Sequence, residues 1–141
     1  MMRAISVGLI LLILAGCGGD SYQLAPVSGQ VRLDGQPLGE CQVRFQPLAI
    51  SENKVNPGPG SFAVTDEQGR FTLKAINPTR PGAVVGKHRV WLNTSKPAGP
   101  MESESGRMTP EKVPAKYRNG QIEFDVLPEG TDQANFDLSS K

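Results

Sequence analysis

The chain has 141 residues, among them 16 glycines and 12 prolines, and its formal charge is +1. Glycine and proline together make up about a fifth of the chain, against roughly 12% in average proteins, and this surplus favours a β fold with many turns. The length suits one domain with a modest core, and the near-neutral charge argues against nucleic acid as a partner.

The first 16 residues have the features of an export signal. Arg3 supplies a positive charge, and residues 4–15 are mostly apolar but fewer than the ~20 that a membrane-spanning helix needs. Leu14–Cys17 reads Leu-Ala-Gly-Cys, with small residues directly before the cysteine. This tetrad resembles the lipobox of bacterial lipoproteins, in which the cysteine thiol receives a diacylglycerol group and a peptidase cuts before it. The resemblance implies that Cys17 is lipidated and anchors the chain in a bilayer.

Two other interpretations of the N-terminus stay open, an ordinary secretory signal with a chance cysteine and a short buried helix. Residues 17–26 are predicted to be the lipidated cysteine and a flexible tether, and Gly18–Pro26 reaches at most ~30 Å. In Gram-negative lipoproteins an aspartate after the cysteine signals inner-membrane retention. Gly18 stands there instead, which favours the outer membrane. The predicted location is the cell envelope, with the domain in the periplasm or outside the cell.

Segments of alternating apolar and polar residues predict seven strands. They cover residues 27–33, 41–46, 62–64, 70–74, 87–94, 122–126 and 136–138. Asp34 and Gly35 supply a tight turn after the first strand, and Pro37 is expected to bar pairing there. The pattern predicts an all-β fold, a seven-stranded antiparallel β-sandwich of prealbumin-like or Ig-like type over residues 27–138.

Two proline-containing segments interrupt the strand pattern, residues 48–60 and residues 95–116. Loops of this length are either functional or mobile. The second segment is rich in charged and small residues and has almost no apolar ones. We therefore expect residues 95–116 to form a mobile loop that folding does not require.

Several stretches of the chain resemble a known domain. Val27–Leu38 is similar to the opening of carboxypeptidase regulatory-like domains, and Thr65–Phe71 matches their T-D-x-x-G-x-F turn. Gly82–Lys87 and Pro114–Tyr117 resemble segments of small bacterial lipoproteins built on this module. The resemblance covers about residues 25–138 and implies a transthyretin-like sandwich. In metallocarboxypeptidases the module accompanies a zinc enzyme domain, and no segment of this sequence resembles that domain.

His88 and Cys41 are expected to be structural. His88 is the single histidine, shares a strand face with Val90 and Leu92, and has no cysteine or carboxylate cluster near it in the sequence. Cys41 lies at an inward strand position, where it would pack as a small hydrophobic residue, and lipidation of Cys17 leaves it no disulfide partner. We predict no catalytic residue, no cofactor and no metal, and therefore no enzyme.

Trp91 is the candidate for a contact with a partner. It lies out of phase with the apolar residues of its strand, on the face of Lys87, Arg89 and Asn93. An outward tryptophan flanked by cations suits contact with protein or carbohydrate. The alternative is that Trp91 packs under one of the long loops, and the sequence leaves both open.

These features predict a non-catalytic envelope lipoprotein that serves as a membrane-tethered binding, assembly or structural module. Its partners would be the bilayer, through acylated Cys17, and an envelope protein or polysaccharide. The alternatives are a carrier that holds a small ligand between the sheets and a small hydrolase of transthyretin-related type. Tyr117–Gly120 resembles the Y-R-G-S ending of those hydrolases, but lacks the serine and the additional histidines of their site.

Overall fold

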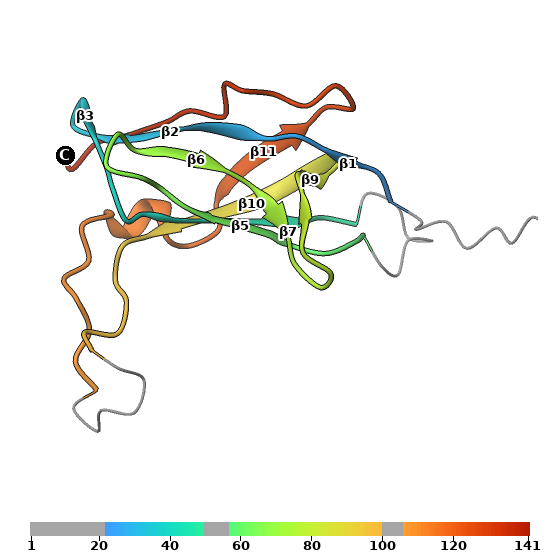
Figure 1. The fold of residues 1–141 in the computed structure, drawn as a ribbon. Helices are drawn as coiled ribbons and strands as arrows, with labels where there is room; N and C mark the ends of the chain where they lie inside the picture. Colours follow the sequence, from blue (N-terminus) through green and yellow to red (C-terminus); the bar gives the residue numbers. More distant parts are fainter. Residues whose placement is uncertain (1–21, 50–56, 100–105) are drawn as a thin grey trace, which may run out of the picture.

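The computed structural model describes residues 22–49, 57–99 and 106–141 as an all-β fold (Figure 1). Cys17 and the predicted export signal lie outside the described residues, as do residues 50–56 and 100–105 of the two predicted loops. One 3-10 turn, η1 (Ala115–Tyr117), is the helical element of the described part. Within the described ranges, no helix is long and apolar enough to cross a bilayer.

The larger sheet is antiparallel throughout and has six strands in the order β11-β10-β4-β5-β7-β8. Their bounds are β4 Gln42–Pro47, β5 Ser61–Val64, β7 Lys74–Ala75, β8 Arg80–Pro81, β10 Gly86–Asn93 and β11 Ile122–Val126. Along β4 and β10 buried residues alternate with partly or fully exposed ones, because successive side chains of a strand point to opposite faces.

The smaller sheet is built around β2 (Ser28–Leu33), and a separate pair, β1 (Leu24–Ala25) and β9 (Ala83–Val84), lies beside the sheets. β12 (Phe136–Leu138) pairs with β2 in parallel, whereas β3 (Gln36–Pro37) and β6 (Arg70–Thr72) pair with it antiparallel. The β2–β12 pairing therefore departs from the purely antiparallel arrangement that the sequence predicts.

The core lies between the two sheets. Phe45 of β4 and Phe136 of β12 meet with their ring centroids 6.1 Å apart, and Phe71 of β6 stacks on Phe136 at 6.2 Å. Aromatic pairs at these distances add to the free energy gained from burying their area. The two sheets thus share one hydrophobic cluster, which includes Val31 of β2, Val43 of β4 and other apolar residues from both.

The all-β, largely antiparallel prediction is confirmed, but the number of strands and their pairing differ. A strand of the structure lies in each of the seven predicted segments, and β1, β3, β8 and β9 are additional short strands. The predicted strand 70–74 divides at Leu73, whose backbone N–H donates to the Val27 carbonyl at 2.9 Å. Its two halves, β6 and β7, belong to different sheets.

The expectation that Pro37 bars pairing is wrong. Asp34 and Gly35 have φ values of 50° and 81°, and their tight turn brings Pro37 opposite Arg32 in register. Leu38 N–H donates to the Val31 carbonyl at 2.9 Å. Because this neighbouring residue supplies the donor, the short edge strand pairs without an N–H at the proline.

The described residues of the predicted 17–26 tether are built into the domain, so they do not form a flexible segment. Leu24 and Ala25 pair with β9, and Ala25 is only 2% exposed. The Tyr22 hydroxyl accepts a hydrogen bond from Arg80 Nη2 at 2.8 Å. The ordered domain therefore extends back at least to Tyr22.

The described residues of the 95–116 loop, which the sequence predicts to be mobile and dispensable for folding, are held in place by hydrogen bonds and core packing. Its two arms form a short ladder in which Ala98 N–H donates to the Arg107 carbonyl and Thr109 N–H to the Lys96 carbonyl, both at 2.8 Å. Val113 is 2% exposed and belongs to the hydrophobic core. We call residues 95–99 and 106–113 the arm.

A single carboxylate organises the base of the arm. Glu111 Oε1 accepts hydrogen bonds from Thr94 N–H (2.8 Å), Thr94 Oγ1 (2.9 Å) and Val113 N–H (2.9 Å), and its Oε2 accepts from Ser95 N–H (3.2 Å). Burial raises the pKa of this carboxyl, but the hydrogen bonds from Thr94, Val113 and Ser95 outweigh burial and lower it. The side chain thus remains ionised and holds together two segments that meet at the end of β10.

Candidate functional site

The sequence-predicted contact residues lie on the outward face of the six-stranded sheet. Alternation along β10 places His88, Val90 and Leu92 in the core and leaves Lys87 and Arg89 exposed. The neighbouring strands add their own outward residues to this face, which we call the outer face. Its members named below are Arg44, Phe62, Lys74, Lys87, Arg89, Trp91, Glu123 and Asp125.

Strand register places aromatic and cationic residues of the outer face in one row. Trp91 lies opposite Arg44, Arg44 opposite Phe62, and Phe62 opposite Lys74. Residues directly opposite each other in an antiparallel sheet have Cβ atoms about 4.5–5.5 Å apart, so their side chains are neighbours. The row therefore crosses four strands and alternates ring with positive charge.

The acidic residues of the outer face lie at one edge. Glu123 and Asp125 of β11 are opposite Arg89 and Lys87 respectively. Arg44 and Lys74 have no acidic residue opposite them in the described strands. The positive charge of the outer face is therefore balanced near β11 and in excess toward β5 and β7.

Trp91 is half-buried and its position is restricted by the turn before β11. A Cβ atom added at Gly120 would lie 2.5 Å from Cζ2 and 2.8 Å from Nε1 of the Trp91 ring. Gly120 has a φ of +72°, which favours glycine for a second reason. The ring packs against this turn, and it keeps part of its surface exposed. The two alternatives drawn from the sequence, contact with a partner and packing under a long loop, both stay open.

His88 is fully buried, which agrees with the structural interpretation. Its Nδ1 lies 2.9 Å from the Gly86 carbonyl and donates to it, and its ring centroid is 5.5 Å from that of Phe45. Nε2 is buried and has no hydrogen-bond partner among the described residues. Burial lowers the pKa of His88, against the opposing effects of the Gly86 hydrogen bond and the Asp125 charge. The imidazole is therefore neutral and is sealed from solvent.

Cys41 is also fully buried, with its thiol 3.8 Å from the Gln42 carbonyl. Burial, with a smaller effect from the Glu111 charge, raises the pKa of this thiol to about 12. A thiol that stays protonated is a poor nucleophile and a poor metal ligand. Among the described residues no group of three or more histidine, cysteine, aspartate or glutamate side chains is placed to hold a metal ion.

The Thr65–Phe71 segment is a structural turn. Asp66 Oδ1 accepts hydrogen bonds from the backbone N–H groups of Gln68 and Arg70, both at 2.9 Å, and Thr65 Oγ1 donates to the Leu38 carbonyl at 2.6 Å. Gly69 has a φ of +72°, and a Cβ there would lie 2.3 Å from the Val31 carbonyl oxygen. The aspartate and the glycine of the motif are thus explained by backbone geometry.

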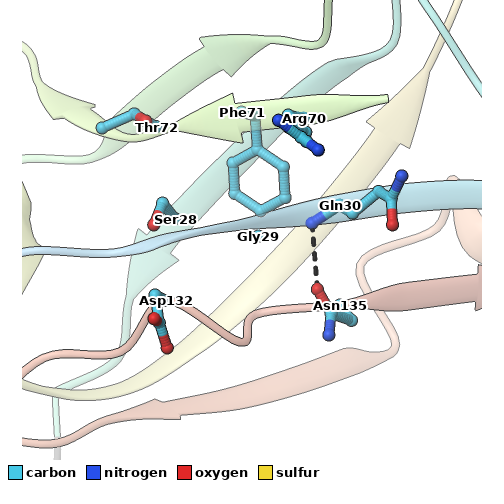
Figure 2. A pocket seen from close by; sticks show the side chains of 8 residues that line it. All are labelled: Ser28, Gly29, Gln30, Arg70, Phe71, Thr72, Asp132 and Asn135. Atoms are coloured by element: carbon cyan, nitrogen blue, oxygen red, sulfur yellow. Dashed lines mark hydrogen bonds between the residues drawn. The ribbon is translucent and has the colours of Figure 1, made fainter. Parts of the chain in front are cut away.

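A pocket of about 340 Å³ lies on the smaller sheet, and the sequence analysis did not single it out (Figure 2). Gln30 N–H donates to Asn135 Oδ1 at 3.1 Å across its floor. Phe71 is buried, and the other lining residues are partly or fully exposed. They are Ser28, Gly29, Gln30, Arg70, Thr72, Asp132 and Asn135. The pocket is therefore a polar surface hollow beside β2 and β6, rather than a space between the sheets.

Gly29 is the feature of the sequence that indicates how this region is built. A Cβ at Gly29 would lie 2.0 Å from the Ala134 carbonyl oxygen, so the 131–135 segment runs directly over β2. A glycine within an alternating strand indicates such a close backbone approach, although it does not identify the segment that approaches.

No family model matches the chain, and no curated protein matches it. Among solved structures, a 9R-lipoxygenase from Cyanothece is similar, with 14% sequence identity and a TM-score of 0.37. The likeness covers 83% of this chain and 16% of the lipoxygenase chain. It is too distant to support any conclusion about this chain.

Proposed function

We propose that the chain is a non-catalytic lipoprotein of the bacterial envelope, anchored through acylated Cys17, whose outer face binds an envelope partner. The anchor is supported by the match of Leu14–Cys17 to the lipobox, and Gly18 favours the outer membrane. The binding role is carried by one observation, the partly exposed Trp91 ring held against Gly120 in a row with cationic and aromatic residues. The partner is an envelope protein or polysaccharide.

The physical argument for binding is that the outer face combines suitable residues with a rigid support. Tryptophan and arginine are enriched among the residues that contribute most to binding free energy. Trp91 and Arg44 sit on β10 and β4, two adjacent interior strands of a six-stranded sheet, so little side-chain freedom is lost when a partner docks. Lys87 and Arg89 add exposed donors along β10, beside the acidic Asp125 and Glu123, where a partner's hydroxyl groups would find hydrogen-bond partners.

We propose further that the domain is a sandwich of the carboxypeptidase regulatory-like type with seven principal strands. The Thr65–Phe71 turn supports this assignment, because its threonine, aspartate, glycine and phenylalanine each have a structural role. The short strands β1, β3, β8 and β9 would then be additions to the common arrangement.

The non-catalytic part of the proposal is supported by the surroundings of the candidate reactive groups. His88 and Cys41 are sealed in the core, where neither reaches a substrate. In the segment that resembles the hydrolase ending, the Tyr117 hydroxyl accepts from Ser139 N–H at 3.1 Å and Arg118 Nε donates to the Val113 carbonyl at 3.0 Å. Both side chains thus take part in local structure.

The experiment is complementation of a deletion strain, combined with crosslinking in the cell. A photoreactive residue at Arg89 should capture a partner that the same residue at Met108, an exposed position on the arm, does not capture. Trp91→Ala should weaken the contact by ~1–3 kcal/mol, or about 5- to 150-fold in affinity, with the fold intact. His88→Ala should affect function only through stability. A silent Trp91→Ala beside a folded but inactive His88→Ala would overturn the proposal in favour of a hydrolase.

A further inference from the structure

The described domain begins close to the proposed anchor. Between Cys17 and Tyr22 there are four residues, Gly18–Ser21. Five Cα–Cα steps span at most ~18 Å when fully extended, and a Gly-rich coil of that length averages ~12 Å between its ends. The headgroup layer of one leaflet takes up several ångströms of this span, since headgroups add ~10–15 Å to the two sides of a bilayer together. An acylated Cys17 would therefore hold Tyr22 at or near the membrane surface.

Tyr22 is fixed to one end of the molecule, which we call the tether end. Its hydroxyl accepts from Arg80 Nη2 at 2.8 Å, and the Arg80 guanidinium lies 5.8 Å from the centre of its ring. Gly58 lies against the same ring, since a Cβ at that position would be 3.1 Å from Tyr22 Cγ. These contacts make the chain leave the domain at a defined place.

The tether end carries apolar and aromatic surface. Ile76 is 45% exposed and lines a hollow of about 310 Å³ with Tyr22 and Pro59. Leu127, 50% exposed, follows β11, whose last residue Val126 pairs with Gly86 at the start of β10. Tyrosine is enriched at membrane–water interfaces, and an arginine beside it can keep its charge at the headgroup level.

The arm lies at the end of the molecule opposite the tether end. β10 runs from the tether end to the arm, and the C-terminus also lies away from the tether end (Figure 1). The strands of the larger sheet thus run between the two ends. A membrane at the tether end would lie across the ends of these strands, and the outer face would point sideways.

We propose that the tether end rests on the lipid surface, with Tyr22, Ile76 and the 57–60 segment against the headgroups. This inference rests on the proposed acylation of Cys17. Such a contact needs little affinity of its own, because a short linker to the acylated cysteine raises the effective concentration of the lipid surface at the tether end to the millimolar range. The consequence is a fixed orientation in which a partner reaches the outer face laterally, at a constant height above the bilayer.

The test uses the full acylated chain in vesicles of phosphatidylethanolamine and phosphatidylglycerol. An environment-sensitive dye is attached at Ile76→Cys, with Thr79→Cys in the same loop as a second variant and Met108→Cys on the arm as the matched control. Met108 is 57% exposed, so its accessibility in solution is similar to that of Ile76. Cys41 is buried with a thiol pKa of about 12, and therefore does not react with the dye.

The expected result is a blue shift at Ile76→Cys and Thr79→Cys, with loss of emission when spin-labelled lipid is added, and an unchanged spectrum at Met108→Cys. Identical spectra at all three sites in a protein that floats with the vesicles would overturn the inference and leave the anchor standing. A chain that does not float with the vesicles would overturn the anchor, and the inference with it.

Discussion

The two faces of the six-stranded sheet differ although they are made by the same strands. On the inner face Phe45, His88 and Leu92 are fully buried, and they meet the smaller sheet through an aromatic cluster. On the outer face Arg44 and Arg89 are exposed, and Trp91 is half-covered by a turn. Adjacent residues of one strand point to opposite faces. Substitutions at two adjacent positions therefore test stability on the inner face and binding on the outer face separately.

The largest expected effect is on the inner face. Phe45→Ala should lower the free energy of unfolding by ~3–5 kcal/mol, because it leaves a cavity among Phe124, Phe136 and His88. Its outer-face counterpart, Phe62→Ala, should cost about 1 kcal/mol or less, since that ring is only half-buried. Urea unfolding followed by far-UV circular dichroism measures both. Equal costs would mean that the two faces are not distinguished by burial as described.

A second inner-face substitution refines the expectation drawn from the sequence. Phe124 packs against Phe45 in the aromatic cluster, but it is only partly buried, on the edge strand β11. Phe124→Ala should therefore cost less than Phe45→Ala in the same unfolding experiment. A larger cost at Phe124 would place the centre of the core nearer to β11.

The next effect concerns the arm. Glu111→Ala should cost about 2–3 kcal/mol, because it removes the acceptor for the Thr94 and Val113 N–H groups, and buried donors without partners are expensive. Glu111→Gln keeps one acceptor oxygen and should cost less. The contribution of the ionised carboxylate should be lost as pH falls through its lowered pKa, below the ordinary value of 4.5. Thermal melts of both variants at pH 7 check the two losses of stability, and melts of the unmutated protein at decreasing pH check the loss of the carboxylate's contribution. Unchanged melting temperatures in the variants would support the prediction that folding does not require residues 95–116.

His88 gives a smaller, pH-dependent effect. Burial lowers its pKa in the folded protein below 6.5, the ordinary value that it regains on unfolding, so protonation favours the unfolded state. Stability should be full above pH 6.5 and fall below it, by at most ~1.4 kcal/mol per pH unit for one proton. His88→Leu removes this titration, so the loss between pH 7 and pH 5.5 should be larger in the natural protein. Parallel curves for the two would show that His88 takes no part in acid sensitivity.

The smallest expected effect on stability is on the outer face. Arg44→Glu should change the free energy of unfolding by no more than ~0.5 kcal/mol, since the side chain is exposed. The same change should reduce partner capture by a crosslinker at Arg89, because it reverses a charge next to Trp91. Capture that is unaffected by Arg44→Glu would show that the contact surface does not include this row.

The strands and the outward position of Trp91 could be predicted because alternation has period two and needs no knowledge of partners. The neighbours of Trp91 could not. Arg44 and Phe62 come beside it through strand register, and the restraint at Gly120 comes from a turn that carries no apolar pattern. An isolated glycine in a turn does not show in the sequence what packs against it.

The failures of the sequence analysis have a common physical origin. β1 has two residues, which is too short for a period to be recognised, yet its pairing with β9 orders the residues predicted to be a tether. The arm is held by backbone N–H groups on Glu111 and by one buried valine, Val113. Hydrogen bonds to the backbone leave no mark in a pattern of apolar residues, so proline and charge alone suggested mobility.

The most direct test of the account is the intact mass of the protein isolated from bacterial membranes, with fragmentation of its N-terminal peptide. The account predicts a polypeptide that begins at Cys17 and carries a diacylglycerol group on the cysteine sulfur. A mature chain with an unmodified Cys17 thiol, or one cut elsewhere, would contradict it, and the orientation proposed for the tether end would fall at the same time.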